Sequence, residues 1–328
     1  MIKIRKKHDW KEYINGNYIV RICAQDGTKI RITDADEFVA EFPESMDLKI
    51  TNYCDRCCAF CHENSTPQGL HGDILNMKFI DTLRPWTEIA IGGGNPLSHP
   101  DLLEFLCKLK KFNIIPNITV HQDHFMKYRD LLKAWSDDKL VYGIGISLNY
   151  NYPVIDPTFL EELKRFPNAV LHVIEGVINL EQMESLLDKD LKVLILGYKM
   201  LRRGLDYYND KTDPAGREFV GRVETGTHGL VNCNMKYMKK NMSRYIHDGS
   251  FKVISFDNLA IENLEMKELL EPKVWEEFYM GDDGNHTMYV DAVTGEFSTS
   301  STTTTRFAIT DDIIDMFNTV KEFKNCPE

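Results

Sequence analysis

The chain has 328 residues, and its 39 Lys and Arg residues against 50 Asp and Glu residues give a formal net charge of −11. With 43% hydrophobic residues the chain can build a large core, so a fully disordered chain and a fibrous repeat are excluded. Nucleic acid is an unfavourable partner for so acidic a chain, because binding a phosphate backbone needs a basic surface. The length fits one large domain with extensions, or two domains.

The sequence has no apolar stretch of the length needed to cross a membrane. Its apolar runs have the length of strands, and the basic start of the chain is not followed by the apolar core of a signal peptide. We therefore expect a soluble, cytoplasmic protein with no membrane partner. Its eight cysteines would then lie in a reducing compartment, where a disulfide framework is not expected.

The first segment of the chain predicts a small β element. Residues 18–23 and 28–32 alternate apolar and polar side chains, and Gln25, Asp26 and Gly27 between them favour a hairpin turn. We assign residues 1–45 to an N-terminal β-hairpin extension.

From Met46 onward, short apolar runs alternate with helical patterns, which is typical of a parallel sheet built from βα units. A helix with Leu102, Leu103, Leu106 and Leu109 on one stripe is expected between the second and third strands. Six such units predict either a barrel with a gap or an open sheet. The expected strands are 47–51, 88–92, 117–121, 142–148, 169–177 and 192–196.

After Gly197 the pattern weakens, and the polar, glycine-containing stretch 202–226 predicts a loop or an insertion. Beyond it we expect a helix at 234–247, a strand at 251–256, a helix at 259–270 and a hairpin of strands 287–291 and 296–300. The segment 285–307, which contains the Ser/Thr run 298–305, is either a solvated hairpin or a lid that closes the barrel mouth and turns its hydroxyls and Arg306 toward the substrate.

Four of the cysteines, Cys54, Cys57, Cys58 and Cys61, fall within eight residues. Two Cys-x2-Cys pairs have a spacing that zinc uses, although zinc sites normally join separated segments and these pairs abut. One such pair is enough for a thiol redox protein, which leaves two thiols without a role. In the third interpretation, Cys54, Cys58 and Cys61 bind three irons of a [4Fe-4S] cluster, since clustered thiolates hold such clusters.

The spacing Cys54-x3-Cys58-x2-Cys61, with Phe60 before the last cysteine and a strand before the first, resembles the radical S-adenosylmethionine (radical SAM) superfamily. The later segment from Gly92 to Pro96 resembles the Gly-Gly-Glu-Pro segment that holds the methionine ammonium in that family. Asn95 stands where Glu is usual, and its carbonyl accepts a hydrogen bond without the charge of a carboxylate.

This resemblance covers residues 46–198 and implies an α/β fold, a partial (β/α)6 barrel of the TIM type, at 46–258. A mixed α/β C-terminal extension then takes 259–328. The implied cofactors are S-adenosyl-L-methionine and a [4Fe-4S] cluster, and the implied partner is an external one-electron reductant of the flavodoxin or ferredoxin type. No second cysteine cluster marks an auxiliary-cluster domain. The implied cofactor-binding residues are Phe60, Gly93, Gly94, Asn95, Pro96, Ser147, Asn149, Leu196 and Tyr198, and the implied metal ligands are Cys54, Cys58 and Cys61.

The function that the resemblance implies is a radical SAM enzyme, which cleaves S-adenosylmethionine reductively to a 5′-deoxyadenosyl radical that abstracts hydrogen from a substrate. The substrate is either a peptide or protein side chain or a small metabolite. Side chains near the carboxyl ends of the strands would face it, and we favour His121 and Glu175. The alternative is a non-enzymatic zinc-binding interaction protein that uses all four clustered cysteines, so that Cys57→Ala abolishes metal binding.

Overall fold

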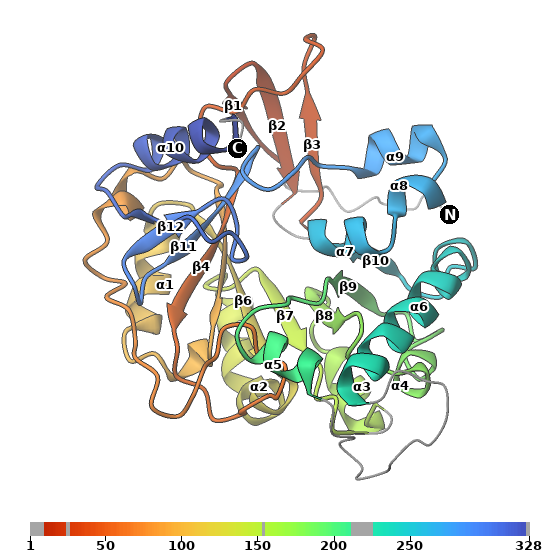
Figure 1. The fold of residues 1–328 in the computed structure, drawn as a ribbon. Helices are drawn as coiled ribbons and strands as arrows, with labels where there is room; N and C mark the ends of the chain where they lie inside the picture. The colour runs from red at the N-terminus through yellow and green to blue at the C-terminus, as the bar shows by residue number, and fades with distance from the viewer. Residues whose placement is uncertain (1–9, 24–26, 153–154, 211–225, 326–328) are drawn as a thin grey trace, which may run out of the picture.

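The computed structural model describes residues 10–23, 27–152, 155–210 and 226–325. Its main feature is a ten-stranded sheet in the order β10-β9-β8-β7-β6-β5-β4-β11-β12-β13, which curves around a central space (Figure 1). The strands from β10 to β11 run parallel to their neighbours, and the sheet does not close, since β10 and β11 are not paired in the described chain. The predicted α/β fold with a partial barrel is therefore confirmed.

All six predicted barrel strands are present, and a seventh continues the sheet beyond them. They are β4 (Ser45–Thr51), β5 (Glu88–Gly93), β6 (Ile115–His121), β7 (Gly143–Ser147), β8 (Ala169–Ile174), β9 (Lys192–Leu196) and β10 (Val253–Phe256).

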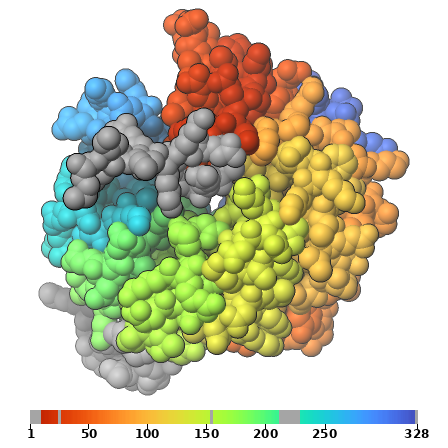
Figure 2. Space-filling model, turned by 180° about the vertical axis from the view of Figure 1, so that it is seen from behind, coloured from red at the N-terminus to blue at the C-terminus, as the bar shows by residue number. Residues whose placement is uncertain are grey.

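Helices cover the outer side of the barrel, because parallel strands need a crossover connection between them. In each strand, alternate side chains point outward and are buried under these helices, as Ile89 and Ile91 of β5 are, both at 0% exposure. Figure 2 views the molecule from behind, and the yellow and green segments form most of its surface there. The elements between the strands are η1 (Lys78–Thr82), η2 (Pro96–Ser98), α1 (Leu102–Lys111), α2 (Gln122–Asp137), α3 (Pro157–Leu163) and α4 (Leu180–Glu184).

The helix α1 was expected, but its buried stripe differs from the prediction. Leu102, Leu106 and Leu109 are buried, whereas Leu103 is 51% exposed and Phe105 packs into the core in its place. Positions three and four apart share a helix face, so Phe105 follows Leu102 on the inner side and Leu103 is turned away from it.

Two predictions for the part of the chain after β9 need correction. The stretch 202–226, expected to be a loop or an insertion without regular structure, contains helix α5 (Arg203–Asn209), and residues 211–225 lie outside the described chain. The helix expected at 259–270 is two short helices, α7 (Asn258–Asn263) and α8 (Met266–Leu269), because the backbone of Glu265 adopts a left-handed φ of 53°. The predicted helix 234–247 is the second half of α6 (Gly226–His247), and α9 (Pro272–Phe278) follows α8.

The predicted C-terminal hairpin is present as β11 (Thr287–Asp291) and β12 (Glu296–Ser298). It extends the barrel sheet, since β11 lies parallel to β4, and β13 (Phe307–Ala308) pairs with β12. The last helix, α10 (Ile313–Asn325), packs against η1. The boundaries at residues 45 and 258 stay predictions. Among the described helices, none has the length and apolar character needed to cross a bilayer.

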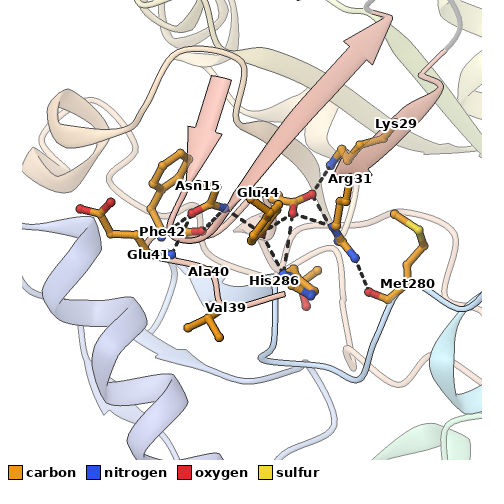
Figure 3. A network of polar contacts seen from close by, with 12 residues as sticks. Asn15, Lys29, Arg31, Val39, Ala40, Glu41, Phe42, Glu44, Met280 and His286 are labelled. Carbon is orange, nitrogen blue, oxygen red and sulfur yellow. Dashed lines mark hydrogen bonds and ion pairs between the residues drawn. The ribbon is translucent and has the colours of Figure 1, made fainter. Parts of the chain in front are cut away.

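The N-terminal segment forms a separate antiparallel sheet of β1 (Trp10–Asn15), β2 (Tyr18–Cys23) and β3 (Lys29–Ile32). The pairing of β2 with β3 confirms the predicted hairpin, although Gln25 and Asp26 of its turn lie outside the described residues and β1 was not predicted. An ion-pair network fixes this sheet to the barrel (Figure 3). Glu44, just before β4, binds Arg31 at 2.7 Å and Lys29 at 3.3 Å, and accepts a hydrogen bond from Tyr18.

Asn15 is the polar anchor at the other side of this junction. Its buried amide donates to the carbonyl of Phe42 (3.0 Å) and accepts from the backbone N–H groups of Glu41 (2.8 Å) and Phe42 (3.1 Å). We expect Asn15→Ala to lower the free energy of unfolding in urea by about 1–3 kcal/mol, because it leaves buried backbone groups unpaired.

The matched control is Asn17→Ala. Asn17 makes the same kind of contacts, to Glu37 and Val39, but at an exposed position where water replaces them. Its loss should cost about 1 kcal/mol or less. If both variants lose the same unfolding free energy, burial does not determine the strength of the Asn15 hydrogen bonds.

Candidate functional site

The interior of the barrel is a cavity of about 740 Å³, which is within the size range of small-molecule binding sites. It is formed by the inward-facing residues of the strands, several of which are small, including Ala90, Gly92, Gly143 and Gly145. The cavity reaches the carboxyl ends of the strands, where the cysteine loop (residues 54–61) follows β4. This is the edge at which parallel barrels place their functional residues.

Three cysteines of this loop line the cavity, and the fourth does not. Cys54, Cys58 and Cys61 are half-buried on the cavity wall, whereas Cys57 is exposed and its backbone takes a left-handed φ of 50°. Burial, followed by the charges of Cys61 and Cys54, raises the pKa of Cys58 to about 11. The three sulfur atoms are therefore close enough to repel one another when ionised.

This donor set fits an iron–sulfur cluster, because three free thiols from one loop face a common space. A cation bound between them would also relieve the repulsion that raises the pKa of Cys58. Within the described residues, no group of three or more His, Cys, Asp or Glu side chains is arranged to hold a single metal ion.

An ion pair and a hydrogen bond to α2 hold one end of the cysteine loop. Arg56 binds Asp123 at 2.6 Å, and Asp55 binds His124 at 2.6 Å. Asn149 donates to both carboxylate oxygens of Asp123, at 3.2 and 3.0 Å, and so keeps that carboxylate turned toward Arg56. The loop is thereby fixed to the first turn of the helix that follows β6.

A buried ion-pair network holds the other end of the loop. Lys49 of β4 lies between Glu63 (2.8 Å) and Asp291 of β11 (3.0 Å), and all three side chains are at most 9% exposed. Burial alone would raise the pKa of Glu63, but the contact with His62 and the charge of Lys49 lower it well below its usual range. Glu63 therefore stays ionised beside the cavity.

The glycine segment after β5 lies directly against the base of the cysteine loop. The N–H of Gly94 donates to the carbonyl of Thr51 (2.7 Å), and the N–H of Asn95 donates to that of Tyr53 (2.6 Å). A Cβ atom on Gly94 would stand 2.1 Å from the Tyr53 oxygen, and Gly93 has a φ of 110°. Only glycine allows this approach, so the segment has a structural role whatever it binds.

The other predicted site residues divide into those that line the cavity and those that do not. Phe60, Gly93, Gly94, His121, Ser147 and Leu196 line it. Asn95, Pro96, Asn149 and Tyr198 are buried beside it, and the Oδ1 atom of Asn95 has no hydrogen-bond partner in the described chain.

Glu175 also lies away from the cavity. Its carboxylate accepts hydrogen bonds from Asn263 and from the N–H of Tyr198, and burial raises its pKa to about 7. His172, three residues earlier, lines the cavity instead, and its ring lies against Gly145 of the neighbouring strand. Burial and the charge of Lys199 lower the pKa of His172 to about 4, so its imidazole is neutral at pH 7.

The Ser/Thr run covers one side of the cavity. Lys199, after β9, donates to the hydroxyl of Ser301 at 2.9 Å, and both residues line the cavity. Arg306 donates to the carbonyls of Ser300 and Ser301 and lies 4.9 Å from the ring centre of Tyr289. The Arg306 guanidinium therefore holds the backbone of the Ser/Thr run in place.

Sequence comparison finds no family model and no curated protein that matches the chain. Comparison of structures finds Streptococcus suis SuiB, in crystal structures bound to the precursor peptide SuiA (TM-score 0.55, 12% identity) and to S-adenosylmethionine (TM-score 0.54, 11% identity). Each alignment covers 95% of this chain and 87% of the SuiB chain. The chain therefore shares the fold of SuiB along almost its whole length.

Proposed function

We propose that the chain is a radical SAM enzyme that binds a [4Fe-4S] cluster through Cys54, Cys58 and Cys61. The observation that carries this proposal is that these three cysteines, and not Cys57, line one cavity at the carboxyl edge of the barrel. The shared fold with SuiB, which has been crystallised with S-adenosylmethionine, supports it. When bound and reduced, such a cluster supplies the electron that cleaves S-adenosylmethionine to a 5′-deoxyadenosyl radical.

The residues of the chain would bind and shield the cofactor. Phe60 is 5.6 Å from Tyr150 and 6.0 Å from Tyr207, measured between ring centres, and this aromatic group excludes water from the space beside the cysteines. The glycine segment offers its backbone to the methionine end, and the unpartnered carbonyl of Asn95 is an acceptor for the ammonium.

The remaining predicted residues take direct or indirect parts in this proposal. Ser147 and Leu196 stand on the cavity wall and would contact the nucleoside. Asn149 would hold the carboxylate of Asp123, which in turn binds Arg56 of the cysteine loop. Tyr198 would position the chain after β9, because its hydroxyl donates to the carbonyl of Gly204 (2.7 Å). His121 and the neutral His172 stand on the cavity wall and would face the substrate.

For the substrate we favour a peptide over a small metabolite, because SuiB has been crystallised with a precursor peptide. An external flavodoxin- or ferredoxin-like protein would deliver the electron. Arg56, within the cysteine loop, and Arg202, after β9, are both partly exposed and provide positive charge for such an acidic partner.

The test is anaerobic purification of the protein, followed by measurement of iron, sulfide, zinc and the visible spectrum. We expect about four irons and four sulfides per chain and a brown colour that dithionite bleaches. Addition of S-adenosylmethionine to the reduced protein should then yield 5′-deoxyadenosine. One zinc per chain with no sulfide after anaerobic reconstitution would overturn the proposal in favour of a zinc-binding interaction protein.

A further inference from the structure

The hydroxyl of Ser65 lies inside the protein without a hydrogen-bond partner. Ser65 is 1% exposed and belongs to the wall of the main cavity, a short distance along the chain from Cys61. Its Oγ atom makes no hydrogen bond in the described chain. A buried hydroxyl without a partner destabilises a fold, so its presence indicates a partner that the chain itself does not supply.

Arg203 of α5 carries a second unpartnered donor at the same place. Its Nη2 group donates to the carbonyl of Ser65 at 2.6 Å, which joins the two residues. Its Nε–H group is buried and has no partner among the described residues. Guanidinium nitrogens donate and do not accept, so the missing partner of Arg203 is an acceptor, and the positive charge favours an anionic one.

Both donors belong to segments that pack against the cysteine loop. The chain beside Ser65 runs along the start of the loop, because the N–H of Cys54 donates to the carbonyl of Thr66 at 2.9 Å. Helix α5 packs on the other end of the loop, where a Cβ atom on Gly204 would stand 3.4 Å from the carbonyl oxygen of Phe60. The two donors therefore lie beside the loop that carries the three cavity-lining thiols.

The charge of Arg203 acts on these thiols. Burial and the charges of Cys61 and Cys54 raise the pKa of Cys58, whereas the charge of Arg203 lowers it. Arg203 is therefore close enough to stabilise negative charge on sulfur. Neither its Nε–H group nor the hydroxyl of Ser65 forms a hydrogen bond to a cysteine sulfur, so the free thiols are not the missing acceptors.

A group bound between the three cysteines would bring further acceptors to this place. The sulfur atoms of an iron–sulfur cluster carry negative charge and accept hydrogen bonds. The segment proposed to hold the methionine end, Gly94 and Asn95, bonds instead to the chain before Cys54. This arrangement favours the cluster over S-adenosylmethionine as the partner of Ser65 and Arg203.

We propose that Ser65 Oγ and Arg203 Nε donate hydrogen bonds to sulfur atoms of the [4Fe-4S] cluster and thereby raise its reduction potential. This inference rests on the proposed function, which supplies the cluster. On reduction the cluster takes one electron from the external reductant and no proton, so its charge becomes one unit more negative. Hydrogen-bond donors and a positive charge stabilise the more negative form and make the cluster easier to reduce.

The experiment measures the midpoint potential of the reconstituted cluster in the full chain without S-adenosylmethionine, by a redox titration followed by electron paramagnetic resonance. For Arg203→Met we expect the equilibrium constant of reduction to fall about tenfold or more, which lowers the potential of a one-electron couple by about 59 mV or more. Ser65→Ala should lower the same constant about threefold or more, because it removes a neutral donor in place of a charged one.

Two variants control for charge and for burial. Arg202→Met removes the same charge from the neighbouring residue, but that side chain is 50% exposed, so water screens the change and the potential should shift less than in Arg203→Met. Ser298→Ala removes a buried hydroxyl that donates to the carbonyl of Thr305 (2.8 Å) and does not line the main cavity. Its potential should equal that of the unmodified chain.

The thermal midpoint of the iron-free chain separates a role toward the cluster from a role in the fold. Ser65→Ala should keep or raise this midpoint, since the hydroxyl has no partner within the fold, whereas Ser298→Ala should lower it. A fall in Ser65→Ala as large as that in Ser298→Ala would show a structural contact and overturn the proposal.

The proposal is also overturned if Ser65→Ala and Arg203→Met titrate like the unmodified chain. Weaker binding of S-adenosylmethionine by these variants at an unchanged potential would identify its carboxylate as the acceptor. If Arg203→Met binds no iron, Ser65→Ala decides the question alone. An unmodified chain without a cluster would remove the proposed function together with this inference, whereas a cluster whose potential is the same in the variants would remove this inference alone.

Discussion

Replacement of Cys58 by alanine is expected to remove the iron of the anaerobically purified protein and to lower the yield of 5′-deoxyadenosine by about 10³-fold or more. Cys58 stands between Cys54 and Cys61 in the loop and shares their cavity wall. A cluster bound by three thiolates loses a third of its protein ligands with this one change. Iron content and 5′-deoxyadenosine formation, measured on the same preparation, check the prediction.

The control is the neighbouring residue. Cys57→Ala should keep both iron and activity, because Cys57 is exposed and does not line the cavity. The zinc interpretation predicts loss of metal in both variants. A Cys57→Ala protein that loses its metal would therefore contradict the assignment of Cys54, Cys58 and Cys61 as the ligand set.

The barrel strands were predictable because each is a short apolar run between turn signals, and 192–196 agrees with β9 at both ends. In contrast, the sequence does not predict which strands β11 and β12 pair with. The pattern of residues 287–291 identifies a strand, but its pairing with β4 joins segments more than two hundred residues apart, which no local pattern encodes. The strand β1 escaped prediction because its exposed face mixes apolar Trp10 and Ile14 with Glu12.

Strand periodicity predicted side-chain direction only as far as the strand ends, whereas Cys54, Phe60 and Gly94, which lie in loops and also line the cavity, were predicted from the resemblance of their motifs. His121, Ser147 and Leu196 are the last residues of their strands and line the cavity, as the period of two requires. Asn149 and Tyr198 lie two residues beyond a strand end, and there the alternation no longer fixes the side-chain direction.

Glu175 shows the same effect one residue after β8, where its carboxylate turns toward Asn263 and away from the cavity. Conversely, Asp47 and Lys49 lie inside a correctly predicted strand, and their alternation with Met46, Leu48 and Ile50 was the signal that both face inward. Substrate-facing candidates were predicted only at strand ends, so Asp47 and Lys49 were missed.

Lys49→Met is expected to lower the free energy of unfolding in urea by about 3–5 kcal/mol, which is large for a single substitution. The change keeps most of the side-chain volume but leaves Glu63 and Asp291 as unpaired carboxylates in the protein interior. Restoring neutrality with Glu63→Gln and Asp291→Asn in the same chain should recover much of the loss.

The matched control is Lys78→Met, which breaks an ion pair of similar length, 2.9 Å to Asp311, at a surface where both side chains are 73% exposed. Its cost should be about 1 kcal/mol or less, because water solvates the remaining carboxylate. If the two lysine variants lose equal stability, burial does not set the strength of the Lys49 network.

Lys49→Met also tests whether Lys49 stabilises only the fold or also the cysteine loop. A cofactor that binds only the folded chain stabilises it in proportion to the logarithm of its affinity. Glu63 lies two residues after Cys61, so a loosened Glu63 should weaken cluster binding as well as the junction of β4 with β11. We therefore expect reconstitution with iron and sulfide to stabilise Lys49→Met less than it stabilises the unmodified chain. If reconstitution stabilises both proteins equally, Lys49 stabilises only the sheet and has no effect on cluster binding.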